Sequence, residues 1–251
     1  MCEKCNNDMN DRQLIFCGDI HGELKSLVSN ELKGIENADL IVCGDFGVGF
    51  GGPNSMNVHY AEVEKKLKEQ GIIVYAVRGN HDDPSYFDGQ HDYELLKFLP
   101  DHTMITLCGK KIYPVGGAVS IDLDMHDRIS GKSRRDINDN YIRRGSRRRV
   151  WWEGEVINEK LKGLPGYADI VVSHEAPLAF SPVPMRPENA EITSDTWEKV
   201  IAGRTYLNHV LNEIRMTRWF YGHHHQSFSG HYGNVLYRGL GINELFGLCG
   251  E

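Results

Sequence analysis

The sequence predicts an α/β fold made of two packed sheets with helices on the outside. Short apolar runs of strand length recur along the 251 residues, and between them lie segments whose apolar residues follow the helical period. Strands that alternate with helices form βαβ units, in which the sheet is mainly parallel and buried on both faces. A hairpin pattern towards the C-terminal end predicts that a second sheet packs against the first.

Five apolar runs are expected to be buried strands, at residues 14–17, 40–43, 72–77, 170–172 and 219–221. Two apolar stripes predict helices. The first stripe comprises Tyr60, Val63 and Leu67 and ends at Gly71, and the second runs over residues 206–214. A short polar signature follows each expected strand, which is where ligands collect in a parallel α/β sheet.

The C-terminal part of the chain follows a different pattern. Residues 227–232 and 235–238 flank Gly233-Asn234, and such a dipeptide between two short strands is typical of a β-hairpin. We expect this hairpin, joined by residues 111–119, to belong to a second, more antiparallel sheet that packs face to face with the first.

The length of the chain is sufficient for one sizeable core, and we expect a single domain over residues 1–251. Two segments have the character of loop insertions over the active face. Residues 122–150 are unusually basic, with nine lysines and arginines up to Arg149. Residues 176–195 contain four prolines between positions 177 and 187, which excludes a helix interior or a central strand there.

Composition excludes several classes of protein. A formal net charge of −7 disfavours a protein that coats nucleic acid without specificity, since that mode of binding needs a positive surface. The apolar runs are much shorter than the roughly 20 residues that span a bilayer, and the N-terminal segment lacks an apolar signal core. We therefore expect a cytoplasmic protein without membrane association.

The cysteines do not form a recognisable zinc site. Cys2 and Cys5 have the spacing of half a site, but four ligands are normally required and the sequence has no second pair. We expect these two thiols to be reduced, and Cys17 and Cys43 to be buried within strands, where a thiol behaves as a small apolar side chain.

The polar signatures after the strands consist of typical metal ligands. They are Gly18-Asp19-Ile20-His21-Gly22, Gly44-Asp45, Gly79-Asn80-His81-Asp82, Ser173-His174-Glu175 and Gly222-His223-His224-His225. Carboxylate, amide and imidazole donors together suit two divalent ions such as Mn, Fe or Zn better than calcium, which takes mainly oxygen ligands. Asp45 offers two oxygens and can bridge two ions ~3.5 to 4 Å apart.

Taken together, these signatures resemble those of the calcineurin-like metallophosphoesterases, and the first is similar to that of the serine/threonine protein phosphatases within that family. The resemblance covers most of the chain and keeps the family's order of motifs. It implies a four-layer α/β/β/α sandwich of two packed mixed sheets around a dinuclear metal centre. The implied ligands are Asp19, His21 and His225 for the first metal, Asn80, His174 and His223 for the second, and Asp45 as the bridge.

The resemblance also implies a reaction. In that family a hydroxide held between the metals attacks phosphorus in line, because coordination lowers the pKa of water into the neutral range. His81 would act as the general acid that protonates the leaving oxygen. The expected activity is that of a metal-dependent phosphoesterase.

The sequence departs from the protein phosphatases directly after Asp45. Their Gly-Asp-x-Val-Asp-Arg-Gly segment is replaced by Gly44-Asp45-Phe46-Gly47-Val48-Gly49, so the aspartate that orients the catalytic histidine and the arginine that grips phosphate have no counterparts. We expect Asp82 or Asp83 to orient His81. For phosphate binding we nominate Arg128, in the basic insertion.

Other residues near the signatures are expected to be structural. His224 lies between two expected ligands and should point away from the metals. Trp151 and Trp152 are expected to anchor the chain by packing rather than to stack on bases. The basic insertion fits either a solvated loop with internal ion pairs or a phosphate clamp, and the first interpretation is favoured.

Three functions are consistent with this sequence. The first is hydrolysis of phosphomonoesters on a phosphoprotein or a small molecule, and the alternative is a phosphodiesterase or nuclease that uses the same centre. A non-catalytic scaffold for partner proteins is disfavoured, because every ligand position is filled. The expected partner is a phosphorylated substrate; nucleic acid enters only as a substrate, and the oligomeric state stays open.

Overall fold

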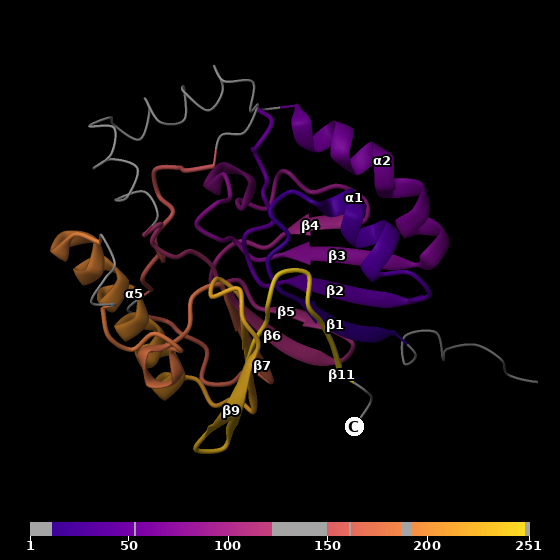
Figure 1. Cartoon of the computed structure of the whole chain (residues 1–251). Helices are drawn as coiled ribbons and strands as arrows, with labels where there is room; N and C mark the ends of the chain where they lie inside the picture. Colours follow the sequence, from indigo (N-terminus) through magenta and orange to yellow (C-terminus); the bar gives the residue numbers. More distant parts are fainter. Residues whose placement is uncertain (1–11, 53, 122–149, 161, 187–191, 249–251) are drawn as a thin grey trace, which may run out of the picture.

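Two sheets packed face to face form the centre of the structure, and helices cover their outer faces (Figure 1). The computed structural model describes residues 12–52, 54–121, 150–160, 162–186 and 192–248. In this part of the chain the architecture is the four-layer α/β/β/α sandwich that the family resemblance implies.

The first sheet has five strands and is mainly parallel. In spatial order it contains β11 (Leu245–Leu248), β1 (Gln13–Cys17), β2 (Ala38–Val42), β3 (Ile72–Ala76) and β4 (Leu96–Phe98). β1 to β4 run parallel, whereas β11 pairs antiparallel with β1. The sequence correctly predicts β1, β2 and β3. It gives no signal for β4 and β11, because edge strands this short carry too few apolar residues to show a period.

The second sheet has six strands. In spatial order it contains β5 (Ile105–Leu107), β6 (Lys110–Val115), β7 (Ile170–Ser173), β8 (Arg218–Tyr221), β10 (Val235–Gly239) and β9 (Phe228–Tyr232). The hairpin of β9 and β10 is confirmed. The expectation of a more antiparallel sheet holds only at the edges, since β6, β7, β8 and β10 are parallel. The reason is that β7 and β8 are joined by a helical crossover, which brings the chain back in the same direction.

In the described part of the chain, the α-helices that flank the sheets are α1 (Leu24–Ser26), α2 (Ser55–Gln70) and α5 (Ser194–Glu213). Figure 1 shows α1 and α2 against the first sheet and α5 against the second. Gly71 ends α2 in the left-handed conformation, with φ of 66°, as its place after the apolar stripe predicts. Among the described residues, every helix is too short or too polar to span a lipid bilayer.

α5 begins well before the predicted stripe at residues 206–214. Thr193 caps its N-terminus, because the Thr193 side chain accepts a hydrogen bond from the N–H of Thr196. The helix thus begins within the second expected insertion, residues 176–195. The described residues 176–186 of that segment contain a short 3-10 turn, Leu178–Phe180.

Alternate residues of the central strands face different apolar clusters. In β1, Ile15 and Cys17 pack towards α1 and α2, whereas Leu14 and Phe16 pack between the sheets. In β8, Phe220 faces the same space between the sheets, and its two neighbours in the strand face α5. Three apolar layers therefore separate the four structural layers, and the strands are buried on both faces as predicted.

Some predicted features lie outside the described residues, namely Cys2, Cys5 and most of the basic insertion, including Arg128. Cys17 and Cys43 are buried free thiols, as the sequence predicts. Burial raises the pKa of both thiols above the ordinary range, so both stay protonated.

The contact between the sheets gives a test of this packing. Phe16 and Phe220 stack across the interface with ring centroids 3.9 Å apart. Phe220→Ala should lower the free energy of unfolding by about 3–5 kcal/mol, because the buried cavity cannot be filled by solvent or by neighbouring side chains. Urea denaturation measures the loss. Phe228→Ala, at a partly exposed position on β9, serves as the control, and an equal loss in both variants would contradict the packing described.

Candidate metal centre

The expected ligands follow the carboxyl ends of parallel strands in both sheets. Asp19 and His21 follow β1, Asp45 follows β2, Asn80 and His81 follow β3, His174 follows β7, and His223 and His225 follow β8. Because these strand ends meet at one side of the sandwich, the structure brings together all seven ligands that the sequence predicts. The role of each as a metal ligand remains a prediction.

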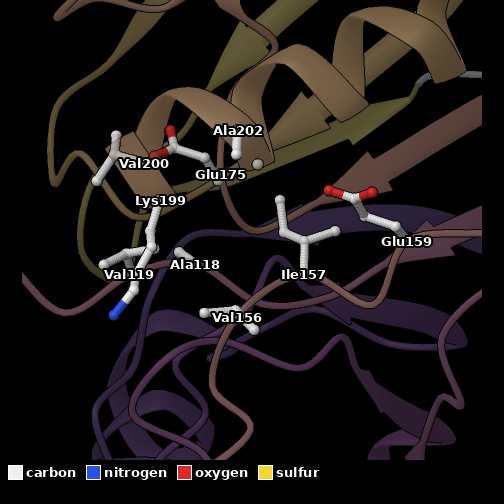
Figure 2. A pocket seen from close by; sticks show the side chains of 10 residues that line it. Ala118, Val119, Val156, Ile157, Glu159, Glu175, Lys199, Val200 and Ala202 are labelled. Carbon is white, nitrogen blue, oxygen red and sulfur yellow. The ribbon is translucent and has the colours of Figure 1, made fainter. Parts of the chain in front are cut away.

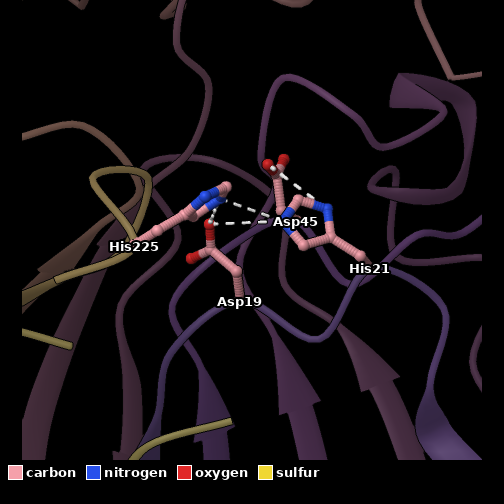
Figure 3. A group of neighbouring side chains, drawn as sticks. All are labelled: Asp19, His21, Asp45 and His225. Carbon is pink, nitrogen blue, oxygen red and sulfur yellow. Dashed lines mark hydrogen bonds and ion pairs between the residues drawn. The ribbon is translucent and has the colours of Figure 1, made fainter. Parts of the chain in front are cut away.

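The first subsite consists of Asp19, His21, Asp45 and His225. One ligand atom from each lies within 4.8 Å of the others, and Figure 3 shows the four side chains facing one another. His225 Nε2 is 3.1 Å from Asp19 Oδ2 and 3.0 Å from His21 Nε2. His21 Nδ1 is 3.9 Å from Asp45 Oδ2. Two carboxylates and two imidazoles therefore converge on one point.

The second subsite consists of Asp45, Asn80, His174 and His223. His174 Nε2 lies 3.0 Å from Asn80 Oδ1 and 3.3 Å from Asp45 Oδ1. The rings of His174 and His223 are 4.9 Å apart between centroids. Since Oδ2 of Asp45 faces the first subsite and Oδ1 faces the second, this carboxylate lies between the two, as a bridging ligand would.

The donor atoms fit divalent cations. Asp19 Oδ2 is buried and accepts no hydrogen bond of good geometry from the described residues, although His225 Nε2 lies at ion-pair distance. His174 Nδ1 donates to the carbonyl of Cys43 at 2.9 Å, so the ring presents Nε2 to the second subsite. Burial alone would lower the pKa of His174, but the charges of Asp45 and Asp19 raise it to about 10. A bound cation would neutralise the charges of Asp45 and Asp19 in place of a proton on His174.

Two of the expected ligand histidines, His21 and His223, favour the neutral form that coordinates metal. Burial lowers the pKa of His21, against the opposing charges of Asp45 and Asp19. Burial also lowers the pKa of His223 well below its ordinary value. The pKa of Asp45 is lowered, since His174, His81 and His21 outweigh the effect of burial. Asp45 is thus ionised beside the neutral imidazoles of His21 and His223, whereas the contact with Asp19 raises the pKa of His225.

Backbone strain is concentrated at the centre. Among the described residues, eight residues other than glycine have a positive φ, and half of them are His21 (45°), Asp45 (47°), His223 (65°) and His225 (54°). This conformation costs a residue with a Cβ roughly 1 kcal/mol or more, and it persists where the surroundings impose it. Its presence at four expected ligands supports a functional site at this position.

Ligand carboxylates also fasten the loops to one another. Asp45 Oδ1 accepts a hydrogen bond from the N–H of His81 at 2.8 Å, and Asp19 Oδ1 accepts one from the N–H of His223 at 3.0 Å. Each bond joins a loop after one strand to a loop after another. The position of each ligand therefore depends on a neighbouring signature.

The glycines of the signatures are required by the same close packing. A Cβ on Gly79 would lie 2.1 Å from Asp45 Oδ1, and a Cβ on Gly222 would lie 2.2 Å from Asp19 Oδ1. Both distances are far shorter than van der Waals contact. Glycine is thus needed at these positions to leave room for a ligand from another loop.

Asp82 joins the loops after β2 and β3. Its buried carboxyl accepts backbone N–H bonds from Phe46, Gly47, Val48 and Gly79, at 3.2, 2.6, 3.1 and 2.8 Å. Burial and the nearby charge of Asp45 raise the pKa of Asp82 to about 6, although the N–H donors act against the rise. The Asp82 carboxyl therefore joins the two loops through hydrogen bonds with backbone N–H groups.

The orientation of His81 differs from expectation. Among the described residues, His81 Nδ1 lies 2.6 Å from the carbonyl oxygen of Val150, a hydrogen bond that helps to orient the ring. The expectation that Asp82 or Asp83 fills this role is wrong, because Asp82 binds the backbone and Asp83 caps a short 3-10 turn through Ser85. A main-chain carbonyl from a distant segment leaves no trace in the sequence.

Two tryptophans hold that segment in place. Trp151 and Trp152 are 3% and 5% exposed, and Trp152 stacks on Phe50 with the ring planes at 6°. Trp151 lies 6.3 Å from the His81 ring between centroids. The expected packing anchor is thus present, and it fixes Val150 beside His81.

His224 belongs to neither subsite, and its side chain points to the buried carboxylate of Glu175. His224 Nε2 is 2.8 Å from Glu175 Oε1, and Glu175 Oε2 is 3.7 Å from His223 Nε2 and 3.0 Å from Arg204 Nε. Burial would raise the pKa of Glu175, but His223, His224 and Arg204 hold it well below its ordinary value. The Glu175 carboxylate thus lies beside His223, an expected metal ligand.

Sequence reasoning overlooked Glu175 and Arg204. Glu175 belongs to the Ser-His-Glu signature, so a signal was available. Arg204 lies in the part of α5 before the predicted stripe, where nothing marks it; it is buried and its guanidinium lies over the ring of Trp197 at 5.5 Å.

The subsites open into a cleft with a volume of about 390 Å³. Asp45, Asn80, His81 and the three consecutive histidines line one side, and Trp197 and Arg204 belong to the rest of the lining. A smaller pocket of about 180 Å³ is lined by Glu175 and mainly apolar side chains, among them residues 156–157 and several of α5 (Figure 2). Its described lining includes none of the expected ligands, so the larger cleft is the candidate substrate site.

The chain was compared with protein families, curated sequences and solved structures. The family model for calcineurin-like phosphoesterases matches residues 13–227. No curated protein sequence matches the chain. The crystal structure of a phosphopantetheinyl hydrolase from Mycobacterium tuberculosis is 14% identical, with 94% of this chain and 91% of that chain covered and a TM-score of 0.47.

A putative 5′-nucleotidase from Staphylococcus aureus, crystallised with α-ketoglutarate, is 12% identical, with a TM-score of 0.41. The alignment covers 92% of this chain and 49% of that chain. Neither similarity bears on the substrate of the present protein.

The role of Asp82 can be tested against its neighbour. Asp82→Ala should lower the free energy of unfolding by about 3 kcal/mol or more, because it leaves four backbone N–H donors without their acceptor. Asp83→Ala, which removes only a cap, should cost about 1 kcal/mol. Thermal unfolding of both metal-free proteins provides the comparison, and an equal loss would show that Asp82 does not join the loops.

Proposed function

Because the chain belongs to the calcineurin-like phosphoesterase family, we propose that it is a metal-dependent phosphoesterase acting on phosphomonoesters, with His81 as general acid. The observation that carries the proposal is the position of Asp45, whose two oxygens face two clusters of ligand atoms. The similarity of the first signature to protein phosphatases supports a monoester substrate, as does a cleft near the lower end of the range for ligand sites, ~300 to 1,000 Å³.

Two divalent ions, of Mn, Fe or Zn, fit the donor set. Asp19, His21 and His225 would hold the first ion, Asn80, His174 and His223 the second, and Asp45 would bind both. Such ions supply a nucleophile at neutral pH and neutralise phosphoryl charge.

The position of His81 supports its proposed role as proton donor. It lines the cleft beside Asp45 and Asn80, and its ring lies 5.9 Å from that of His21 between centroids. Under this proposal, Nδ1 donates to the carbonyl of Val150 and Nε2 gives a proton to a leaving oxygen.

The main alternative is a phosphodiesterase or nuclease with the same centre. With Mn²⁺ supplied, hydrolysis of p-nitrophenyl phosphate should exceed that of bis-p-nitrophenyl phosphate, and a chelator should abolish both. Faster hydrolysis of the diester would reverse the order of these two functions. A metal-free protein that stays inactive after Mn²⁺ is added would instead favour a non-catalytic scaffold.

Replacement of His81 tests the proton donor. His81→Ala should reduce kcat for p-nitrophenyl phosphate by ~10² to 10⁴-fold, since a positioned proton donor contributes about that factor. The metal content should stay unchanged, because His81 is not among the expected ligands. His59→Ala, on the exposed face of α2, is the matched control. An unchanged kcat in His81→Ala would remove His81 from the reaction.

A further inference from the structure

Hydrogen bonds determine which end of the Asn80 amide faces the second subsite. Asn80 Oδ1 lies 3.0 Å from His174 Nε2, and Asn80 Nδ2 donates to Ser120 Oγ at 2.9 Å. The oxygen and nitrogen ends of an amide have almost the same shape, so packing alone does not choose between them. Asn80 is 2% exposed, and the choice therefore depends on its protein partners.

Ser120 is in turn bound by Glu155. The Ser120 hydroxyl donates to Glu155 Oε2 at 2.8 Å, and the Ser120 N–H donates to Oε1 at 3.2 Å. A hydroxyl has a single proton, and since the carboxylate takes it, Oγ can only accept from Asn80. If the Asn80 amide were reversed, its oxygen would face Ser120 Oγ, which is also an acceptor. Its N–H groups would then face the second subsite.

Glu155 is fixed by the loop that carries Asn80. Arg78, two residues before Asn80, is buried and donates to the carbonyls of Gly154, Glu155 and Val156 at 2.9, 3.0 and 3.0 Å. Glu155 is 1% exposed as part of this arrangement. The loop after β3 thus holds both ends of the hydrogen-bond chain.

We propose that Glu155, acting through Ser120, is a positioning residue that turns the oxygen of Asn80 towards the second metal ion. The proposal rests on the assignment of Asn80 to that ion under the proposed function. Partners that orient a metal ligand typically change metal affinity by about 10- to 100-fold. Because these hydrogen bonds end at Asn80, an expected ligand of the second subsite, their loss should weaken the binding of the second ion and leave the binding of the first unchanged.

Titration of the metal-free protein with Mn²⁺ tests this selectivity. Wild-type protein should bind two ions, and Ser120→Ala should bind the second about 10- to 100-fold more weakly, with the first unchanged. Electron paramagnetic resonance should then show isolated Mn²⁺ in the variant at concentrations where the wild type shows an exchange-coupled pair. Ser120→Thr keeps the hydroxyl and should restore the pair.

Two further variants separate positioning from loss of structure. Glu155→Gln keeps the size of the side chain but replaces one acceptor by a donor, and it should also weaken the second ion. Ser181→Ala removes another buried hydroxyl, which accepts from Val183 N–H at 3.3 Å, and it should bind both ions normally. Thermal unfolding of each metal-free variant shows whether it folds. If Ser120→Ala does not fold, the Mn²⁺ titration of Glu155→Gln provides the test.

The outcomes distinguish this proposal from the proposed function. Two ions bound with unchanged affinity in Ser120→Ala and Glu155→Gln would overturn the positioning role and leave the dinuclear centre intact. Equal weakening of both ions would also overturn it. A wild-type protein that binds fewer than two ions would overturn the dinuclear assignment, and the role of Glu155 with it.

Discussion

Buried carboxylates that accept backbone N–H groups hold the metal centre together. Loops that leave strand ends carry N–H groups without partners in the sheets, and a buried N–H without a partner costs about 1–3 kcal/mol. Asp82 satisfies four of them, while Asp19 and Asp45 each satisfy one from another loop. The strained conformations of the ligand residues persist because these bonds fix the loops from several directions. The same carboxylates that shape the backbone therefore also create the negative field that attracts cations.

The fold was largely predictable, because long apolar runs and helical stripes are properties of local sequence. Strands such as β1 and β3 are buried on both faces, so nearly every residue in them is apolar and the pattern is unmistakable. The strand directions in the second sheet were harder to predict from the sequence. Parallel or antiparallel pairing depends on the crossover between β7 and β8, and the start of α5 there is set by a cap at Thr193 rather than by an apolar stripe.

That the expected ligands lie together was predictable, because these residues are chemically distinctive and lie directly after strands. The groups that orient them were not. His81 is oriented by the carbonyl of Val150, and every residue has a carbonyl, so only the three-dimensional structure can identify the one that matters. Ser120 and Glu155 belong to no motif, and their relation to Asn80 arises from the way Arg78 gathers the surrounding chain. Glu175 stood within a recognised signature, yet its contact with His223 could not be read from spacing.

The pairing of β11 with β1 has a consequence for the order in which the protein is made. β1 carries the first ligand loop, and its outer neighbour is a strand that is synthesised more than 200 residues later. The N–H of Gly18, just before Asp19, also donates to the carbonyl of Glu244. Ribosomal synthesis adds residues at roughly 5–20 per second. The nascent chain therefore exposes Asp19 and His21 for many seconds before the strand that flanks β1 has been made.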